Sequence, residues 1–248
     1  MQVDVVEVAP GVHHARAKHV SWVLVTEGRE VTLIDSGYPG DRVRVTASLE
    51  RIGRSPADLR AVLLTHAHPD HIGSAAYLRR VHGVPVLAHQ REAGNVRGDR
   101  IEQVSELTLL RMLWRPAVML WLFDVLRLHG ARPERLRELD LFTEGRLDVP
   151  GAPVAVPTPG HTSGHTSFHL PDRGALVVGD ALMTGHVLAR RRGPQLLPEF
   201  FNTDTGQARA SLQRLAGLAA DVVVPGHGPI FPGSPALAVR QALESSPG

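Results

Sequence analysis

The chain has 248 residues, of which 43% are hydrophobic and 21% charged, and its formal net charge is +2. This is the composition of an ordinary globular protein rather than of a disordered or membrane-spanning one. Lys18 is the only lysine, so the positive charge is almost all arginine and does not by itself indicate nucleic-acid binding. Without cysteine there are no disulfides or thiolate ligands, which leaves imidazole and carboxylate for any metal ion. We expect a cytoplasmic location, because the first residues, MQVDVVEVAPGVHH, do not resemble a secretory signal.

Two series of predicted elements follow one another along the chain. The first contains strands at 3–8, 20–26 and 31–37, a helix at 41–53, a strand at 61–64, a helix at 70–82 and a strand at 84–88. The second contains strands at 153–158, 167–170 and 175–180, a helix at 204–219 and a strand at 221–226. Their similar plan predicts one domain over 1–248, in which two sheets pack together with helices outside.

The segment 96–140 lies between these series and is unusually apolar. Charged residues such as Arg111 and Asp124 interrupt it, so it contains no uncharged run of 18 residues and is not expected to span a membrane. Pro116 predicts that two helices meet near Arg115. Its large apolar side chains leave three interpretations open, namely plain packing, a homodimer contact, or a lid that lines an apolar slot. These side chains are Met112, Trp114, Met119, Trp121 and Phe123.

The densest group of polar residues follows a short apolar strand, in the sequence LLTHAHPDHIGS. His66 and His68 are two residues apart, so an extended backbone presents both imidazoles on one side. Pro69 disfavours helical geometry at His68 and keeps this pair extended. Asp70 and His71 then fall at the start of the next helix, where the helix dipole favours an anion and a neutral imidazole. This spacing rarely arises by chance, even in a chain with 14 histidines, and it predicts a metal site.

Three later residues occupy similar places, each after an apolar strand and next to glycine. They are His161 in VPTPGHTSGH, Asp180 in ALVVGDALM and His227 in VVVPGHGP. Each alone is weak evidence, since a lone histidine or aspartate at a strand end more often serves as a cap or a core residue. Together with the histidine motif, they predict one site assembled from strand ends.

These motifs resemble those of the metallo-β-lactamase superfamily, and of its glyoxalase II and lactonase branch in particular. The resemblance rests on THAHPDH at 65–71, TPGHTSGH at 158–165, VVGDAL at 177–182, PGHGP at 225–229 and LIDSG at 33–37. It implies an α/β (α+β) fold, a four-layer αβ/βα sandwich with 96–140 as a helical insertion. It also implies that one metal ion takes His66, His68 and His161, that a second takes Asp70, His71 and His227, that Asp180 bridges them, and that Asp35 steadies the ligand loop.

Such ligands suit two Zn²⁺ ions per chain, with Fe or Mn also admissible. Two metals of this kind hold a hydroxide nucleophile, and Asp70 or Asp180 would pass on its proton. We therefore expect a binuclear hydrolase of a small-molecule ester, thioester or lactone. The alternatives are a mononuclear-iron persulfide dioxygenase, a phosphodiesterase or nuclease, a minor β-lactamase activity, and a non-catalytic metal-binding member.

Departures from the family pattern bear on the substrate. Met183 stands where lactonases of this fold commonly have a tyrosine, and Arg240 is the only cation after His227, whereas glyoxalase II enzymes grip glutathione with a basic C-terminal region. All-histidine β-lactamases usually lack the aspartate that stands here as Asp180. A small-molecule substrate other than glutathione is therefore expected.

The remaining candidates surround these motifs. Arg190, Arg191 and Arg192 form the only dense cationic cluster, which is either a solvated turn or a contact to an acidic substrate. Because this cluster is too small for a phosphate backbone, we expect no nucleic-acid partner. His165, His169 and His186 are expected to have structural or positioning roles, and His186 is the one most expected to line the pocket.

Overall fold

The computed structural model describes residues 3–131, 134–189 and 191–245, which form two sheets. The first sheet has seven strands among these residues, in the order β1 (Asp4–Ala9), β2 (Val12–Arg16), β3 (Ser21–Glu27), β4 (Glu30–Ile34), β5 (Leu59–Leu63), β6 (Val86–His89) and β7 (Asp140–Phe142). The second has six, in the order β13 (Phe231–Pro232), β12 (Val222–Pro225), β11 (Ala175–Gly179), β10 (Thr166–Leu170), β9 (Val154–Pro157) and β8 (Gly145–Arg146).

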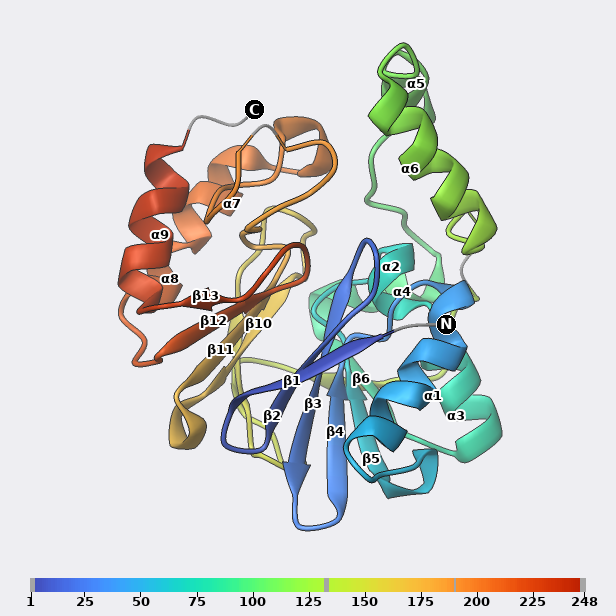
Figure 1. Cartoon of the computed structure of the whole chain (residues 1–248), viewed down its shortest axis with the longest axis vertical. Helices are drawn as coiled ribbons and strands as arrows, with labels where there is room; N and C mark the ends of the chain where they lie inside the picture. Colours follow the sequence, from blue (N-terminus) through green and yellow to red (C-terminus); the bar gives the residue numbers. More distant parts are fainter. Residues whose placement is uncertain (1–2, 132–133, 190, 246–248) are drawn as a thin grey trace.

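Helices cover the outer faces of both sheets (Figure 1). The first sheet is covered by α1 (Arg42–Arg51) and α3 (Ala75–His82), and the second by α7 (Thr205–Ser211), α8 (Gln213–Ala216) and α9 (Pro235–Glu244). The other α-helices are α2 (Pro69–Ile72), α4 (Ala93–Arg97), α5 (Glu106–Leu110) and α6 (Pro116–Arg127). Short 3₁₀ helices occupy Pro39–Asp41, Pro56–Asp58, Gln90–Glu92, Pro171–Arg173 and Glu199–Phe201.

Strand β3 shows why helices pack on one face of the first sheet and the second sheet packs on the other. Successive side chains of a strand point to opposite faces, and every residue from Ser21 to Val25 is buried. Trp22 and Leu24 enter the cluster under α1 and α3, whereas Val23 and Val25 enter the cluster between the two sheets. A third cluster lies between the second sheet and α7 to α9. The predicted four-layer sandwich is therefore confirmed.

Two predicted helices are each divided in the structure. The helix expected at 70–82 consists of α2 and α3, because the chain at Gly73 passes close to another loop. A Cβ atom at Gly73 would lie 2.2 Å from the carbonyl carbon of Tyr38 and 2.3 Å from the oxygen of Gly37. The helix expected at 204–219 is likewise divided into α7 and α8 near Leu212.

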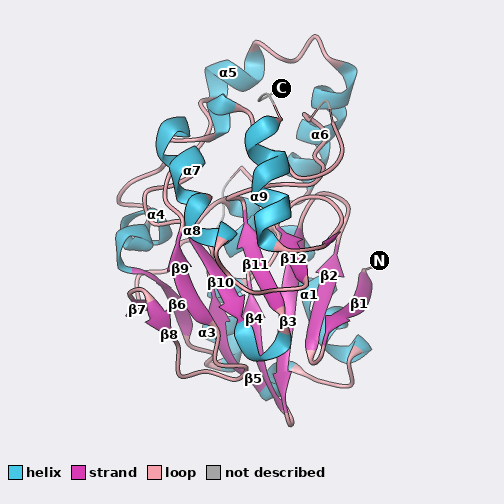
Figure 2. Cartoon of the chain, turned by 90° about the vertical axis from the view of Figure 1, so that its left-hand side faces the viewer, coloured by secondary structure: helices cyan, strands magenta, loops and turns pink. Residues whose placement is uncertain are grey.

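The segment 96–140 contains the two helices expected to meet at Pro116. Arg115 is extended, with φ −88° and ψ 115°, and α6 begins at Pro116. Figures 1 and 2 show α5 and α6 extending beyond the two sheets as an arm. The exposed fraction of Trp121 is 8%, so this residue packs as expected, whereas Trp114 is 81% exposed. No helix in the described residues has both the length and the apolarity needed to cross a membrane.

Asp124 attaches this arm to the N-terminal part of the chain. Its Oδ2 atom lies 2.5 Å from Nζ of Lys18 and 2.8 Å from Nε2 of His19. Since Lys18 and His19 lie between β2 and β3, the pairing holds α6 against the end of the first sheet.

We expect His14, on β2, to make the fold acid-sensitive. Burial, reinforced by the charge of Arg16, lowers the pKa of His14 to about 4, and its buried Nε2 has no hydrogen-bond partner among the described residues. The unfolded chain takes up this proton near pH 6.5, so the stabilisation is complete above pH 6.5 and is lost as the pH falls toward 4. At pH 5 this costs about 2 kcal/mol, because one pKa unit corresponds to about 1.4 kcal/mol.

Urea unfolding of the wild type and of His14→Leu at pH 7.5 and pH 5 measures this contribution. Leucine has a similar volume and does not titrate, and every other histidine is common to both proteins. The wild type should lose about 2 kcal/mol more than the variant between the two pH values. Equal losses in both proteins would contradict the assignment.

Candidate metal centre

The site lies where parallel strands of both sheets end. Strands β4 and β5 are parallel, and so are β11 and β12, so the carboxyl ends of each pair lie at the same edge of its sheet. Asp35 directly follows β4, His66 lies three residues after β5, Asp180 directly follows β11, and His227 lies two residues after β12. The strand-end placement predicted from the sequence is thus what brings these residues together.

The loop after β5 has the geometry that its proline dictates. His68 is extended, with φ −69° and ψ 153°, and Pro69 is the first residue of α2. Close packing shapes the loop after β12. A Cβ atom at Gly226 would lie 2.4 Å from Oδ1 of Asp180 and 2.8 Å from Cε1 of His71. Glycine therefore leaves room for these two side chains to approach each other.

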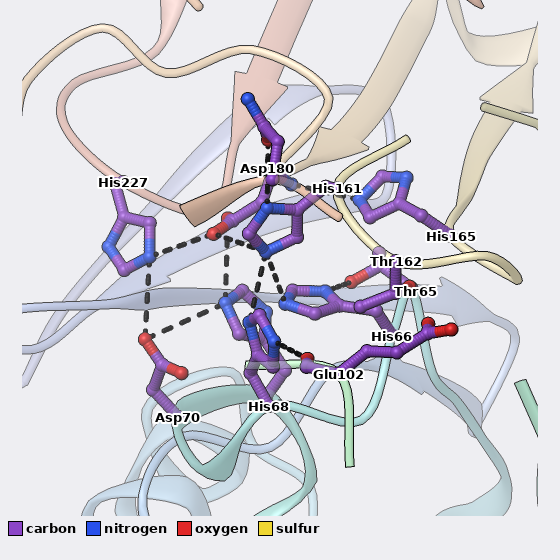
Figure 3. A network of polar contacts seen from close by, with 12 residues as sticks. Thr65, His66, His68, Asp70, Glu102, His161, Thr162, His165, Asp180 and His227 are labelled. Carbon is purple, nitrogen blue, oxygen red and sulfur yellow. Dashed lines mark hydrogen bonds and ion pairs between the residues drawn. The ribbon is translucent and has the colours of Figure 1, made fainter. Parts of the chain in front are cut away.

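Potential metal ligands form three overlapping groups, each with its donor atoms within 4.8 Å of one another. The first contains His66, His68 and His161, the second contains Asp70, His71 and His227, and a third, made of His66, His71 and Asp180, joins them. In the first group, Nε2 of His161 lies 2.9 Å from Nδ1 of His68 and 3.2 Å from Nε2 of His66. Figure 3 shows the imidazoles of His66 and His68, from one loop, converging with that of His161 from another.

Asp180 lies between the two groups (Figure 3). Its Oδ2 atom is 3.6 Å from Nε2 of His161 in the first group and 3.2 Å from Nε2 of His227 in the second. Its Oδ1 atom is 3.5 Å from Nε2 of His71. Asp180 thus contacts both groups, which also meet where the ring centroids of His66 and His71 lie 4.1 Å apart.

Each of the five histidines has its outer ring nitrogen next to an oxygen acceptor. The pairs are His66 Nδ1 with Thr65 Oγ1 at 3.0 Å, His68 Nε2 with the Glu102 carbonyl at 2.6 Å, His71 Nδ1 with Asp35 Oδ2 at 2.8 Å, His161 Nδ1 with Asn202 Oδ1 at 3.3 Å, and His227 Nδ1 with the His19 carbonyl at 2.7 Å. Carbonyl, carboxylate and amide oxygens only accept, and the Thr65 hydroxyl already donates to Asp35, so the outer nitrogen carries the proton. Whenever the inner nitrogen is free of a proton, it directs a lone pair at the centre, as metal-ligating imidazoles do.

The residues present fit divalent cations. Within the described residues, Nε2 of His71 and Oδ1 of Asp180 are buried without a hydrogen-bond partner. In the group of His66, His68 and His161, the lone pairs of the inner nitrogens point at one another. This is unfavourable unless a cation or a proton lies between them. Imidazole and carboxylate donors without thiolate suit Zn²⁺, Fe or Mn.

The two groups differ in how they hold protons. Burial, with neighbouring imidazoles adding to it, lowers the pKa of His66 and His161 well below 6.5, so both are neutral. Burial acts in the same direction on His71, but the carboxylates around it, Asp180 foremost, raise its pKa to about 9. A cation bound there would take the place of that proton.

Asp35 occupies the position expected of it, beside the ligands. Its carboxylate accepts hydrogen bonds from the backbone N and Oγ1 of Thr65, at 2.9 and 2.8 Å, and lies 2.8 Å from Nδ1 of His71. Its backbone has φ 61°, a conformation uncommon for a residue other than glycine. Asp35 thus orients the ligand loop and His71 together.

The other sequence candidates have different environments. His165 accepts a hydrogen bond from the backbone N of Asp180 at 3.1 Å, and burial lowers its pKa to about 3, so it positions that loop as a neutral ring. His169 contacts the Ala219 carbonyl at 2.8 Å and lies away from the cluster. Arg191 is exposed and does not line the cavity next to the candidate ligands. Arg190 lies outside the described residues.

Glu92 is a positioning residue that the sequence did not reveal. Its fully buried carboxylate accepts hydrogen bonds from Ala67 N at 3.0 Å, Thr162 Oγ1 at 2.8 Å and Gly164 N at 3.1 Å. It therefore ties the His66–His68 loop to the loop that carries His161. Its neighbours in the sequence, HQREAGN, are polar, and nothing in them distinguishes Glu92 from a surface acid.

A pocket of about 290 Å³ opens above the cluster. Its floor contains His68, Asp70, His161, Asp180 and His227, and Met183 and His186 line it as well. Its walls are largely apolar and come from the arm and from the segment near α7. They include Leu109, Trp121, Leu122, Val125, Leu126, Leu197 and Phe201, while Tyr38 adds a buried phenol. Side chains of the arm thus form part of the pocket wall.

Comparisons with known proteins agree with this geometry. A model of the metallo-β-lactamase superfamily matches residues 15–227. The chain is 31% identical over 236 residues to a probable metallo-hydrolase, YflN, of Bacillus subtilis (strain 168), over 90% of this chain and 85% of that protein. It is 28% identical over 214 residues to a hydroxyacylglutathione hydrolase of Tolumonas auensis, over 86% of this chain but only 62% of that protein.

Solved structures show the same fold. A metallo-β-lactamase with a HARLDQ motif from Cronobacter sakazakii has a TM-score of 0.67 at 21% identity, over 96% of this chain and 90% of that chain. The subclass B3 metallo-β-lactamase BJP-1 of Bradyrhizobium japonicum has a TM-score of 0.66 at 16% identity, over 94% of this chain and 88% of that chain. At such low identity, these two structures bear on the fold alone.

Proposed function

Because the chain belongs to the metallo-β-lactamase superfamily and is a metal-dependent hydrolase, we propose that it holds two metal ions and hydrolyses a small-molecule ester, thioester or lactone with an apolar acyl group. The observation that carries this proposal is the position of Asp180. Its two oxygens face both ligand groups, and the floor formed by these groups lies under an apolar pocket.

The residues of each group define what they would bind. His66, His68 and His161 would hold one ion, and Asp70, His71 and His227 would hold the other, with Asp180 shared between them. Two cations bound there would lower the pKa of water toward about 7 and would polarise the carbonyl oxygen of the substrate. Zn²⁺ is the first choice for these nitrogen and oxygen donors.

The chain itself handles the protons and excludes water. Asp70 and Asp180 are the carboxylates beside the reacting centre, and either one can accept the proton that leaves the attacking water. Burial raises the pKa of Tyr38 well above 10, and the charge of Asp70 adds to this, so Tyr38 stays a hydrogen-bond donor next to Asp70. Apolar side chains of the arm line the pocket and would exclude water from the part of a substrate that they contact.

The apolar wall supports an acyl substrate in particular. We expect Trp121→Ala to lower kcat/KM for an eight-carbon acyl ester by about 10-fold or more, because an apolar side chain of this size contributes roughly 1.5–3 kcal/mol when buried. A two-carbon ester, which does not reach the arm, should change much less. Trp114→Ala is the matched control, since Trp114 is 81% exposed and does not line the pocket. Equal effects of both variants on both esters would count against an acyl pocket.

The proposal is tested by assaying metal-quantified protein on an ester, a thioester, a lactone, a phosphodiester and a β-lactam. Turnover of one of the first three at near two zinc ions per chain is the expected result. Turnover confined to the phosphodiester or the β-lactam would contradict the substrate class. One iron per chain, with oxygen consumed on a persulfide, would contradict hydrolysis itself.

A further inference from the structure

We propose that a second pocket, beside the metal centre, binds a phosphate-bearing group of the substrate. This inference rests on the proposed function and narrows it to esters and thioesters whose leaving group is anionic. The pocket has a volume of about 1070 Å³ and lies between the β2–β3 connection and the segments after β11 and β12.

The lining of this pocket is cationic. Arg16, Lys18, Arg191 and Arg192 line it, and Asp4 is the one carboxylate among its lining residues. Lys18 is paired with Asp124 of the arm. Among the described residues, no carboxylate forms an ion pair with any of the three arginines that line the pocket. Arginine is the side chain best suited to phosphate, because its guanidinium donates two parallel hydrogen bonds.

His186 joins this pocket to the metal centre. It lines both pockets, and its ring centroid lies 5.1 Å from that of His227. Gly228, the residue after His227, is also part of the cationic lining. His19 makes a second link, since it lines the cationic pocket and its carbonyl accepts the hydrogen bond of His227 Nδ1.

The two pockets therefore share His186 as a lining residue, which lies next to the candidate ligand His227, and they differ in character. An apolar acyl group fits the pocket under the arm, and a phosphate-bearing alcohol or thiol fits the arginine pocket, which places the scissile carbonyl between them. Water then adds its oxygen to the acyl carbon as the bond from that carbon to oxygen or sulfur breaks. The leaving group takes up a proton, and the products are an acid and a phosphorylated alcohol or thiol.

A solvated surface turn is the competing interpretation of these arginines, because runs of charge are usually exposed faces. Such a turn needs neither a hollow of this size nor cations drawn from distant parts of the chain. Here Arg16 comes from β2, while Arg191 and Arg192 come from the segment after β11. Their convergence on one hollow favours a binding site.

A matched pair of thioesters tests the proposal in the metal-loaded enzyme. The same octanoyl group is offered on coenzyme A, which carries phosphates, and on N-acetylcysteamine, which is uncharged. For the wild type, kcat/KM should be at least about 10-fold higher on the coenzyme A thioester, because only this substrate can accept charge-assisted hydrogen bonds from the arginines. That ratio should fall toward 1 in R16Q/R191Q/R192Q, and 0.5 M NaCl should reduce it in the wild type.

Arg29→Gln is the matched control, since Arg29 lies in the β3–β4 turn, is exposed and does not line the pocket. It should keep the wild-type ratio. An equal ratio in the wild type and the triple variant would overturn the arginine site even if both thioesters are hydrolysed.

A binding measurement separates this inference from the proposed function. Adenosine 3′,5′-bisphosphate should bind the metal-loaded protein at least about 10-fold more weakly in R16Q/R191Q/R192Q than in the wild type or in R29Q. If neither thioester is hydrolysed but this difference is found, the thioesterase function fails and the anion site stands. If the bisphosphate binds all three proteins equally, or binds none, the anion site fails.

Discussion

The Asp180→Asn variant should lose at least about 10³-fold in kcat/KM on any substrate that the wild type hydrolyses. The carboxylate of Asp180 faces both ligand groups, with Oδ2 3.2 Å from Nε2 of His227 and 3.6 Å from Nε2 of His161. Asparagine keeps the size but removes the negative charge and turns one oxygen into a donor. Since metal catalysis supplies several kcal/mol and each 1.36 kcal/mol is tenfold in rate, losing a shared ligand should cost about 10³-fold.

Steady-state kinetics together with elemental analysis measure this effect, and metal content should fall with activity. Asp172→Asn is the control, because the side chain of Asp172 is 74% exposed and its only ion pair among the described residues is with Arg146. Full activity in Asp180→Asn would contradict the role of Asp180 and favour a non-catalytic metal-binding protein.

The Asp35→Asn variant should lose about 10–100-fold in affinity for the second metal ion, because residues that orient metal ligands contribute this much. Asp35 accepts the hydrogen bond of His71 Nδ1, which leaves the lone pair on Nε2 facing Asp180. An asparagine amide turned toward His71 would favour the other tautomer, with its proton on Nε2. The Asp70, His71 and His227 group would then lose one of its donors.

Metal titration of stripped protein measures this selectively. The second equivalent should bind Asp35→Asn more weakly, and the first should be affected less, because Asp35 contacts His71 directly but reaches His66 only through the hydroxyl of Thr65. Asp58→Asn is the control, because it also removes one carboxylate, but from a site far from the metal centre. Asp58 accepts hydrogen bonds from the backbone N and the hydroxyl of Ser55. Unchanged affinity for both equivalents in Asp35→Asn would show that Asp35 does not fix the His71 tautomer.

The candidate metal ligands were easier to predict from the sequence than the residues that hold them in position. His66, His68 and Asp70 follow one strand at a spacing that local geometry explains, and His161 and His227 follow others next to glycine. Local sequence is sufficient there, because parallel strands bring their carboxyl ends to the same edge. Glu92 has no such signal, since its importance depends on two loops that meet only in the fold.

The fold shows the same division between local and tertiary information. Strands rich in valine, leucine and isoleucine, such as β3 and β11, were predicted, whereas β2, with the sequence VHHAR, was not. Neither were the short edge strands β8 and β13 or the helix α9, whose places are set by packing on the second sheet. The break of α2 from α3 at Gly73 depends on contact with Gly37 and Tyr38, which lie more than 30 residues earlier.

The arm was assigned two helices but not a role. Its sequence is apolar on more than one face, and Trp121 and Trp114 are indistinguishable by spacing alone. The structure separates them, because Trp121 lines the pocket and Trp114 is exposed. Which apolar residues face the pocket depends on the orientation of the arm relative to the sheets. The pairing of Asp124 with Lys18 and His19 contributes to that orientation.

The most direct test of the two-metal proposal is to titrate Zn²⁺ into chelator-stripped protein while recording hydrolysis of an octanoyl thioester. We predict that activity is absent without metal, stays low at one equivalent and reaches its maximum at two equivalents per chain. Full activity at one equivalent, or activity that survives complete removal of metal, would contradict a binuclear centre joined by Asp180.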